Sequence, residues 1–150
     1  MTSQANAGRA PAWITLLLIL IGATHVINGL AMYFAPSAWF FRLVPGVPET
    51  GAFNAHLVVD GGSFFIPIGV GLLIASRDPR RHIVAIGVAA GAGLLHSLLH
   101  IYSHAAGLLS SQHITTEITG IYLPTLALIV ITLMLQTRPA PATIAHVEAA

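Results

Sequence analysis

The stretch AFNAHLVVDGGSFFIPIGVGLLIA, from Ala52 to Ala75, decides the fold. It is almost wholly apolar over about the 20 residues that an α-helix needs to cross a bilayer core. His56 and Asp60 interrupt it, and residues four apart lie on one face of a helix. Because a carboxylate inside a membrane is energetically costly, we expect this pair to have a functional role.

Three further apolar runs predict an integral membrane protein with four spanning helices. The chain has 150 residues, of which 55% are hydrophobic and only 7% are charged, against ~25% charged in an average soluble domain. We expect an all-α, membrane-embedded four-helix bundle that forms one domain, 13–136, between disordered tails. The expected spans are 13–34, 52–75, 83–106 and 114–135, and the expected tails are 1–12 and 137–150.

The arginines predict the orientation of the chain in the membrane. All basic residues other than histidine are arginines, and Arg42 alone falls in the connection between the first two spans. The other five lie on the opposite side: Arg9, Arg77, Arg80, Arg81 and Arg138. Short cytoplasmic segments collect positive charge, so both termini are expected to be cytoplasmic. The net charge of +1 reflects this topology and does not indicate a nucleic-acid partner.

The two inward-running spans carry the same polar pattern. His56, Asp60, Ser63 and Pro67 have the same spacing as a second set in the last span: His113, Glu117, Gly120 and Pro124. This spacing is consistent with a two-fold repeat of helix pairs about an axis along the membrane normal. With ~1.5 Å of rise per residue, these acids and the histidines of the other two spans all fall in the outer half of the bilayer.

A bound metal ion would best explain why histidines and carboxylates lie together in the outer half of the bilayer. Neutral imidazoles and carboxylates are good ligands, and a cation offsets the carboxylate charge. The candidate ligands are His25, His56, Asp60, His96, His100, His113 and Glu117. This donor set suits iron, zinc, manganese or copper(II), while the absence of cysteine removes thiolate sites. The leading hypothesis is a metal-dependent membrane oxidoreductase, with one or two ions and a small or hydrophobic substrate.

Several alternatives remain open from the sequence. A b-type haem between helices would use two histidines as axial ligands, with small residues admitting the ring. The residues considered for that space are Gly22, Gly29, Ala89 and Gly93. A proton or ion path is a further alternative. In a purely structural role, His56 with Asp60 and His113 with Glu117 would be hydrogen-bonded pairs, and His104 would meet water at the membrane edge.

Two other expectations concern surfaces. The connection between the first two spans contains Trp39-Phe40-Phe41-Arg42, a composition typical of the headgroup layer, and it lies on the outer surface either as an anchor or as a lid. The pair Gly87-x3-Gly91 suits close helix packing, either within the bundle or against a second protomer.

The segment Phe53-Asn54-Ala55-His56-Leu57-Val58-Val59-Asp60-Gly61-Gly62, preceded by Pro45-Gly46-Val47-Pro48-Glu49-Thr50-Gly51, resembles small bacterial four-helix membrane proteins akin to the DoxX-like group. The likeness covers this segment and the four-helix layout. It implies a bacterial inner-membrane protein associated with redox processes, and it brings no catalytic residues to carry over.

Overall fold

The structure is a computed structural model that describes residues 10–137, and within this range every regular element is helical. The long helices are α1 (Ala12–Phe34), α3 (Ala55–Ala75), α4 (Ile83–Ala105) and a fourth, segmented helix. The fourth consists of α5 (Ile114–Glu117), a π-helical turn η4 (Ile118–Tyr122) and α6 (Leu123–Thr137). Four stretches are long and apolar enough to cross a membrane: Ala12–Phe34, Ala55–Ala75, Ile83–Ala105 and Ser111–Thr137.

The predicted all-α fold is therefore confirmed, with four helices long and apolar enough to span a membrane and with small shifts of boundary. The second span begins at Ala55 because the Asn54 side chain caps it, accepting a hydrogen bond of 3.2 Å from the Leu57 N–H. The third ends at Ala105, where Gly107, with φ +70°, reverses the chain and the Leu108 N–H bonds the Ser103 carbonyl. The expected tails lie almost entirely outside the described residues, apart from Ala10 to Ala12 and Thr137.

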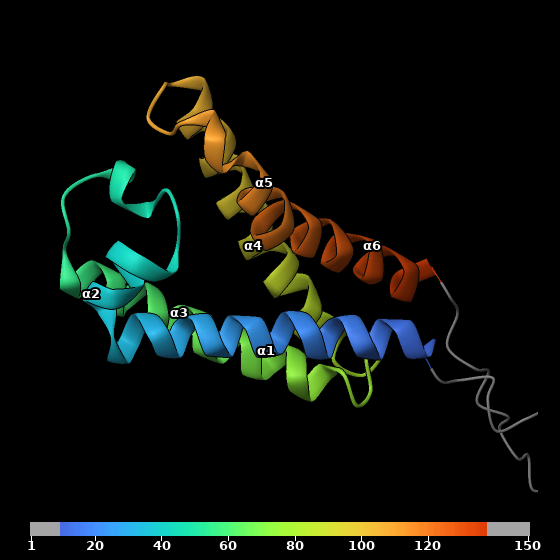
Figure 1. The fold of residues 1–150 in the computed structure, drawn as a ribbon. Coiled ribbons are helices and arrows are strands. Elements are labelled where there is room, and N and C mark those ends of the chain that lie inside the picture. Colours follow the sequence, from blue (N-terminus) through green and yellow to red (C-terminus); the bar gives the residue numbers. More distant parts are fainter. Residues whose placement is uncertain (1–9, 138–150) are drawn as a thin grey trace, which may run out of the picture.

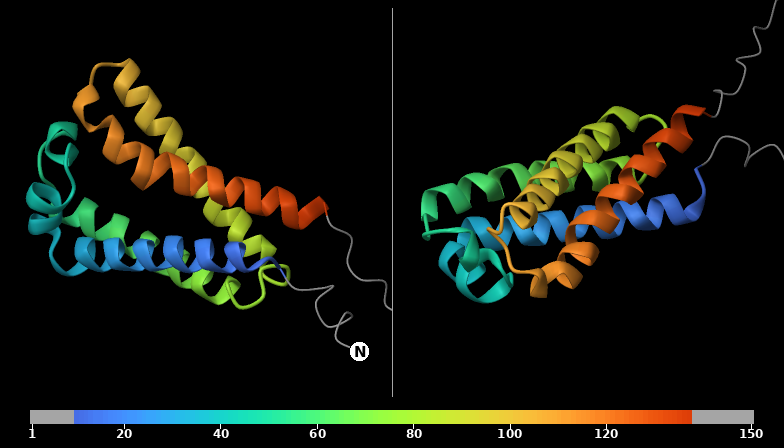
Figure 2. Two further views of the ribbon diagram at one scale, coloured as in Figure 1. Left: turned by 45° about the vertical axis from the view of Figure 1, so that its right-hand side comes forward. Right: turned by 90° about the horizontal axis from the view of Figure 1, so that it is seen from above.

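Two helix pairs make up the bundle (Figure 1). Helices α1 and α3 run side by side, and α4 packs against α6. The chain enters α1 and leaves α6 at one end of the bundle, and we call the opposite end the distal end. Toward the distal end the two pairs diverge, as the further views also show (Figure 2).

Glycine makes the close approach of α1 and α3 possible. A Cβ on Gly69 would lie 2.6 Å from the Gly22 carbonyl oxygen, and a Cβ on Gly62 would lie 2.8 Å from the Gly29 carbonyl oxygen. The two backbones are thus in contact through small residues, as in tightly packed membrane helices. The neighbour of Gly22 and Gly29, which the sequence analysis considered as space for a haem ring, is therefore the backbone of α3.

The main apolar core lies toward the end that carries the termini. Its fully buried members come from all four long helices: Ile14, Leu18, Leu72, Ile86, Leu128 and Ile131. A smaller cluster of Met32, Phe40 and Val58 holds the distal ends of α1 and α3 against η1 (Trp39–Leu43). The polar contacts of Glu117 and of His113 lie beyond this core, in the distal half of the bundle.

Candidate functional site

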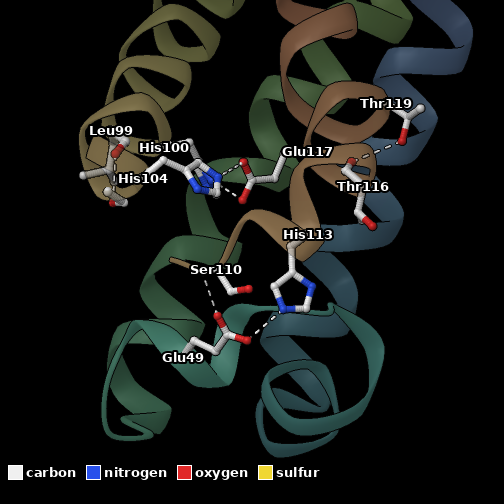
Figure 3. Close-up of polar contacts among 10 residues, drawn as sticks. Glu49, Leu99, His100, His104, Ser110, His113, Thr116, Glu117 and Thr119 are labelled. Atoms are coloured by element: carbon white, nitrogen blue, oxygen red, sulfur yellow. Dashed lines mark hydrogen bonds and ion pairs between the residues drawn. The ribbon is translucent and has the colours of Figure 1, made fainter. Parts of the chain in front are cut away.

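The polar centre of the distal half is the carboxylate of Glu117, the last residue of α5. Its side chain is only 8% exposed, and both oxygens meet histidines of α4. His104 Nε2 lies 2.7 Å from Oε2, and His100 Nδ1 lies 3.2 Å from Oε1 (Figure 3). His100 and His104 are one helical turn apart, so α4 presents both imidazoles on the same face. We call these three residues the Glu117 cluster.

The two imidazole contacts are not equivalent. His104 Nε2 and Oε2 form a short hydrogen bond, with the imidazole N–H donating to the carboxylate. His100 Nδ1 is buried but has no hydrogen bond, although Oε1 is within 3.2 Å. A buried nitrogen without a hydrogen bond is unusual in a protein and calls for a physical reason.

Local structure explains why Glu117 points at α4. The π turn η4 follows Glu117 directly and widens the helix by one residue, and π turns of this kind often occur at functional sites. Two turns further on, Thr125 fixes the register of the helix pair. Its hydroxyl accepts a hydrogen bond of 3.3 Å from Ser97, and a Cβ on Gly93 would lie 2.6 Å from the same oxygen.

A row of aromatic rings extends from the Glu117 cluster toward α1. The His96 ring stacks at 4.8 Å from the His100 ring, measured between centroids. Phe65 of α3 contacts His96 at 6.3 Å and His25 at 5.4 Å. His25 Nδ1 also lies 2.9 Å from the carbonyl oxygen of Ile21 in its own helix. His96 therefore touches the cluster through His100, and His25 is linked to His96 through Phe65.

The remaining candidates lie elsewhere. His113 Nε2 is 2.8 Å from Oε1 of Glu49, a residue of the connecting 3-10 turn η2 (Val47–Thr50). His56 and Asp60 contact each other at 3.4 Å, and their side chains are 87% and 52% exposed on α3. The structure therefore brings His96, His100 and Glu117 together, places His25 nearby, and separates His113, His56 and Asp60 from them.

Two expectations of the sequence analysis change at this point. His113 and Glu117 do not pair with each other, because Glu117 turns to α4 while His113 turns to Glu49 (Figure 3). The two copies of the His-x3-acid pattern consequently have different surroundings. His104, which only the structural alternative considered and placed in water, is the closest partner of Glu117. Its i, i+4 spacing from His100 was the available signal.

The contact between His113 and Glu49 links the two connections at the distal end. Glu49 Oε2 also accepts a hydrogen bond of 3.1 Å from the Ser110 N–H. The contact with His113, and next the bond from Ser110, hold the pKa of Glu49 below its usual value of 4.5. The His113 ring packs onto Gly46, where a Cβ would lie 3.0 Å from ring atoms. The first connection thus reaches across to the second one, as a lid would.

The fit to metal and to haem can be tested on these side chains. Between residues 10 and 137, no group of three or more His, Asp or Glu side chains has an arrangement that could hold a metal ion. The space considered for haem is filled by protein: α3 backbone covers Gly22 and Gly29, Thr125 lies against Gly93, and Ala89 is a core residue. Phe65 contacts both His25 and His96. These residues do not form a haem cleft in this structure.

An open cleft of about 220 Å³ lies near the cluster, but none of the three cluster residues lines it. Leu20, Ile21 and Thr24 line one side, and Thr119, Gly120 and Pro124 line the other. Figure 3 shows Thr119 pointing away from α4, whereas Glu117 points toward it. The cleft and the cluster are therefore on different faces of the segmented helix.

Comparison of the chain with protein-family models, with curated proteins and with solved structures finds no match. The argument for function therefore rests on the geometry of the Glu117 cluster.

Proposed function

We propose that the protein is a membrane-embedded metalloprotein in which the Glu117 cluster binds a transition-metal ion. The observation that carries the proposal is His100 Nδ1, a buried nitrogen without a hydrogen bond beside a buried carboxylate. A neutral imidazole nitrogen and a carboxylate are ligands for the same ions, and the cation would compensate the carboxylate charge.

The ligands would be His100, His104 and Glu117, with His96 packed behind His100. Binding requires the hydrogen bond between His104 and Glu117 to open, because a metal ligand presents a lone pair where the N–H now points. Metal binding would therefore release a proton, as is general for histidine ligands. The bound ion would supply redox chemistry if it is iron or copper, and the proposed reaction class is then oxidation of a small or hydrophobic substrate. Zinc would make the site non-redox.

Elemental analysis of the purified protein tests this proposal. After growth with iron, copper, zinc and manganese and purification without chelators, we expect about one ion per chain for a site of this size. Glu117→Gln and His104→Ala should lose it, because each removes a ligand. His56→Ala is the matched control and should retain the metal, since His56 is exposed on α3.

Three results would contradict the proposal: a metal-free wild type, a Glu117→Gln variant with undiminished metal, or a His56→Ala variant that loses as much. A visible spectrum of the same sample tests the haem alternative, which predicts a Soret band.

Proton binding is the second candidate, favoured by the 2.7 Å hydrogen bond between His104 and Glu117. The same residues would then exchange a proton with the distal side. In vesicles, a pH-driven flux that disappears in Glu117→Gln, in protein that contains no metal, would support this candidate over metal binding.

The cellular setting is part of the proposal. The four spans support a multi-pass membrane protein in contact with lipid. We propose the bacterial inner membrane, with both termini in the cytoplasm, because arginines gather in the termini and in the connection between α3 and α4. The distal half that holds the Glu117 cluster would then be the outer half of the bilayer.

A further inference from the structure

The second connection, between α4 and α5, joins the two sides of the Glu117 cluster. His104 is the second-last residue of α4, and Glu117 is the last residue of α5. Between them the chain turns back at Gly107 and forms the 3-10 turn η3 (Ser111–His113). The 2.7 Å contact between His104 and Glu117 therefore closes this connection into a loop. A movement that separates the two side chains must also move the loop.

The first connection holds this loop at several points. Glu49 accepts a hydrogen bond of 3.1 Å from the Ser110 N–H, and its other carboxylate oxygen lies 2.8 Å from Nε2 of His113 (Figure 3). The Gln112 side chain donates a further hydrogen bond of 3.3 Å to the same carboxylate. Gly46, with φ +85°, brings its backbone against the His113 ring, where a side chain would not fit. We call Gly46 and η2 the strap.

One helical turn connects the strap to the Glu117 carboxylate. Helix α5 begins directly after His113 and ends at Glu117, and four residues of helix rise only ~6 Å. Holding His113 therefore restrains the start of the short helix that carries Glu117. The strap also holds Ser110, on the part of the loop that leads back to His104.

We propose that the strap controls access to the Glu117 cluster by holding the second connection closed. The side chains of His100, His104 and Glu117 are only 21%, 18% and 8% exposed, so a solute must wait for local opening of the structure. The inference rests on the proposed function where the solute is a metal ion, because binding of the ion separates His104 from Glu117. The same control applies to other small solutes, so it can be measured without metal.

A disulfide between Gly46→Cys and His113→Cys would lock the strap. A Cβ on Gly46 would lie 3.4 Å from the Cβ of His113, close to the ~3.5–4.5 Å found in disulfides, and the chain has no cysteine of its own. The double variant lacks the contact of His113 with Glu49, so the strap is loosened in its reduced form and closed in its oxidised form. Comparing the two forms removes the effect of the substitutions themselves.

Modification of His104 by diethyl pyrocarbonate reports access to the cluster. It is measured by mass spectrometry on the full chain in detergent, after treatment with a chelator. We expect the oxidised form to react at least about tenfold more slowly at His104 than the reduced form. His56, whose side chain is 87% exposed, should react equally in both. Equal rates at His104, or a disulfide that does not form, would overturn the proposal.

Glu49→Gln tests the strap without a cysteine in the strained backbone of Gly46. The substitution removes the charge that holds His113, so His104 should react about threefold faster than in the wild type. Asp60→Asn is the matched control, because it removes the charge beside a histidine on α3 and should leave His104 unchanged. An equal effect of the two variants would contradict the proposal.

The strap and the metal site fail in different experiments. If the wild type holds no metal but reduction of the double variant releases His104, metal binding is rejected and the strap is supported. If the wild type holds metal but reduction changes nothing at His104, the metal site stands and the strap is rejected.

Discussion

Three carboxylates of this protein, at the residue scale, show how position determines chemical role. Glu117 is buried between two imidazoles of α4. Glu49 joins the two distal connections through His113 and Ser110. Asp60 has a histidine of its own helix beside it and is half exposed. Only the first is buried and has two histidines against its oxygens, although all three have a histidine partner.

The pKa of Glu49 predicts an acid-sensitive contact. Because His113 lowers the pKa of Glu49 in the folded state, the contact contributes stability above the ordinary pKa of 4.5 and loses it as pH falls through the lowered value. Spin labels on Thr50→Cys and Ser111→Cys should therefore move apart on acidification below that range. In a Glu49→Gln background the distance should not change with pH over this window. A pH-independent distance in the unmodified background would contradict the prediction.

Helix pairing, at the element scale, depends on backbone contact between α1 and α3. Their glycines bring the two helix backbones so close that a Cβ at any of these positions would overlap the facing helix. Helix α4 instead makes polar contacts with the segmented fourth helix, through Thr125 of α6 and Glu117 of α5. The first pair is joined through its backbones, while the second carries the side chains of the Glu117 cluster. Divergence of the pairs at the distal end (Figure 1) leaves room for the connection that holds Glu49.

Gly69→Ala should disrupt the first pair. A Cβ at this position would lie 2.6 Å from the Gly22 carbonyl oxygen, so the helices must separate, and overpacking of this kind costs about 1–3 kcal/mol. Gly91→Ala on α4 is the matched control, because a Cβ there meets nothing within 4 Å. Unfolding in mixed detergent micelles measures both variants. An equal effect of the two substitutions would show that the approach of α1 and α3 is not the cause.

The whole molecule separates an apolar half from a polar half. The buried core lies near the termini, and the Glu117 cluster and the contact between Glu49 and His113 lie toward the distal end (Figure 3).

The proposed orientation predicts which connections face outward. In intact cells, a membrane-impermeant maleimide should label Ser111→Cys in the distal connection and should not label Asp78→Cys between α3 and α4. Lysed cells should label both, which controls for reactivity. The reverse pattern would place the Glu117 cluster in the cytoplasmic half, although the cluster itself would be unchanged.

The sequence predicted the features that depend on composition and period. Apolar runs of membrane length fix the number and type of helices, since backbone groups in lipid must bond within their own helix. Among the residues that it proposed as metal ligands, His96, His100 and Glu117 lie next to one another, while His56, Asp60 and His113 lie apart from them. It did not find the role of His104, whose distance from Glu117 depends on how α4 turns back at Gly107.

The sequence by itself therefore determined four helices long and apolar enough to span a membrane, with the ionisable groups of those helices toward one end. Only the tertiary structure decided which of those groups meet. His56 and Asp60 repeat the spacing of His113 and Glu117, but spacing fixes the face within one helix and not the direction of that face in the bundle. The rotation of α3 turned its pair outward, while the π turn after Glu117 and the register set by Thr125 turned Glu117 toward α4.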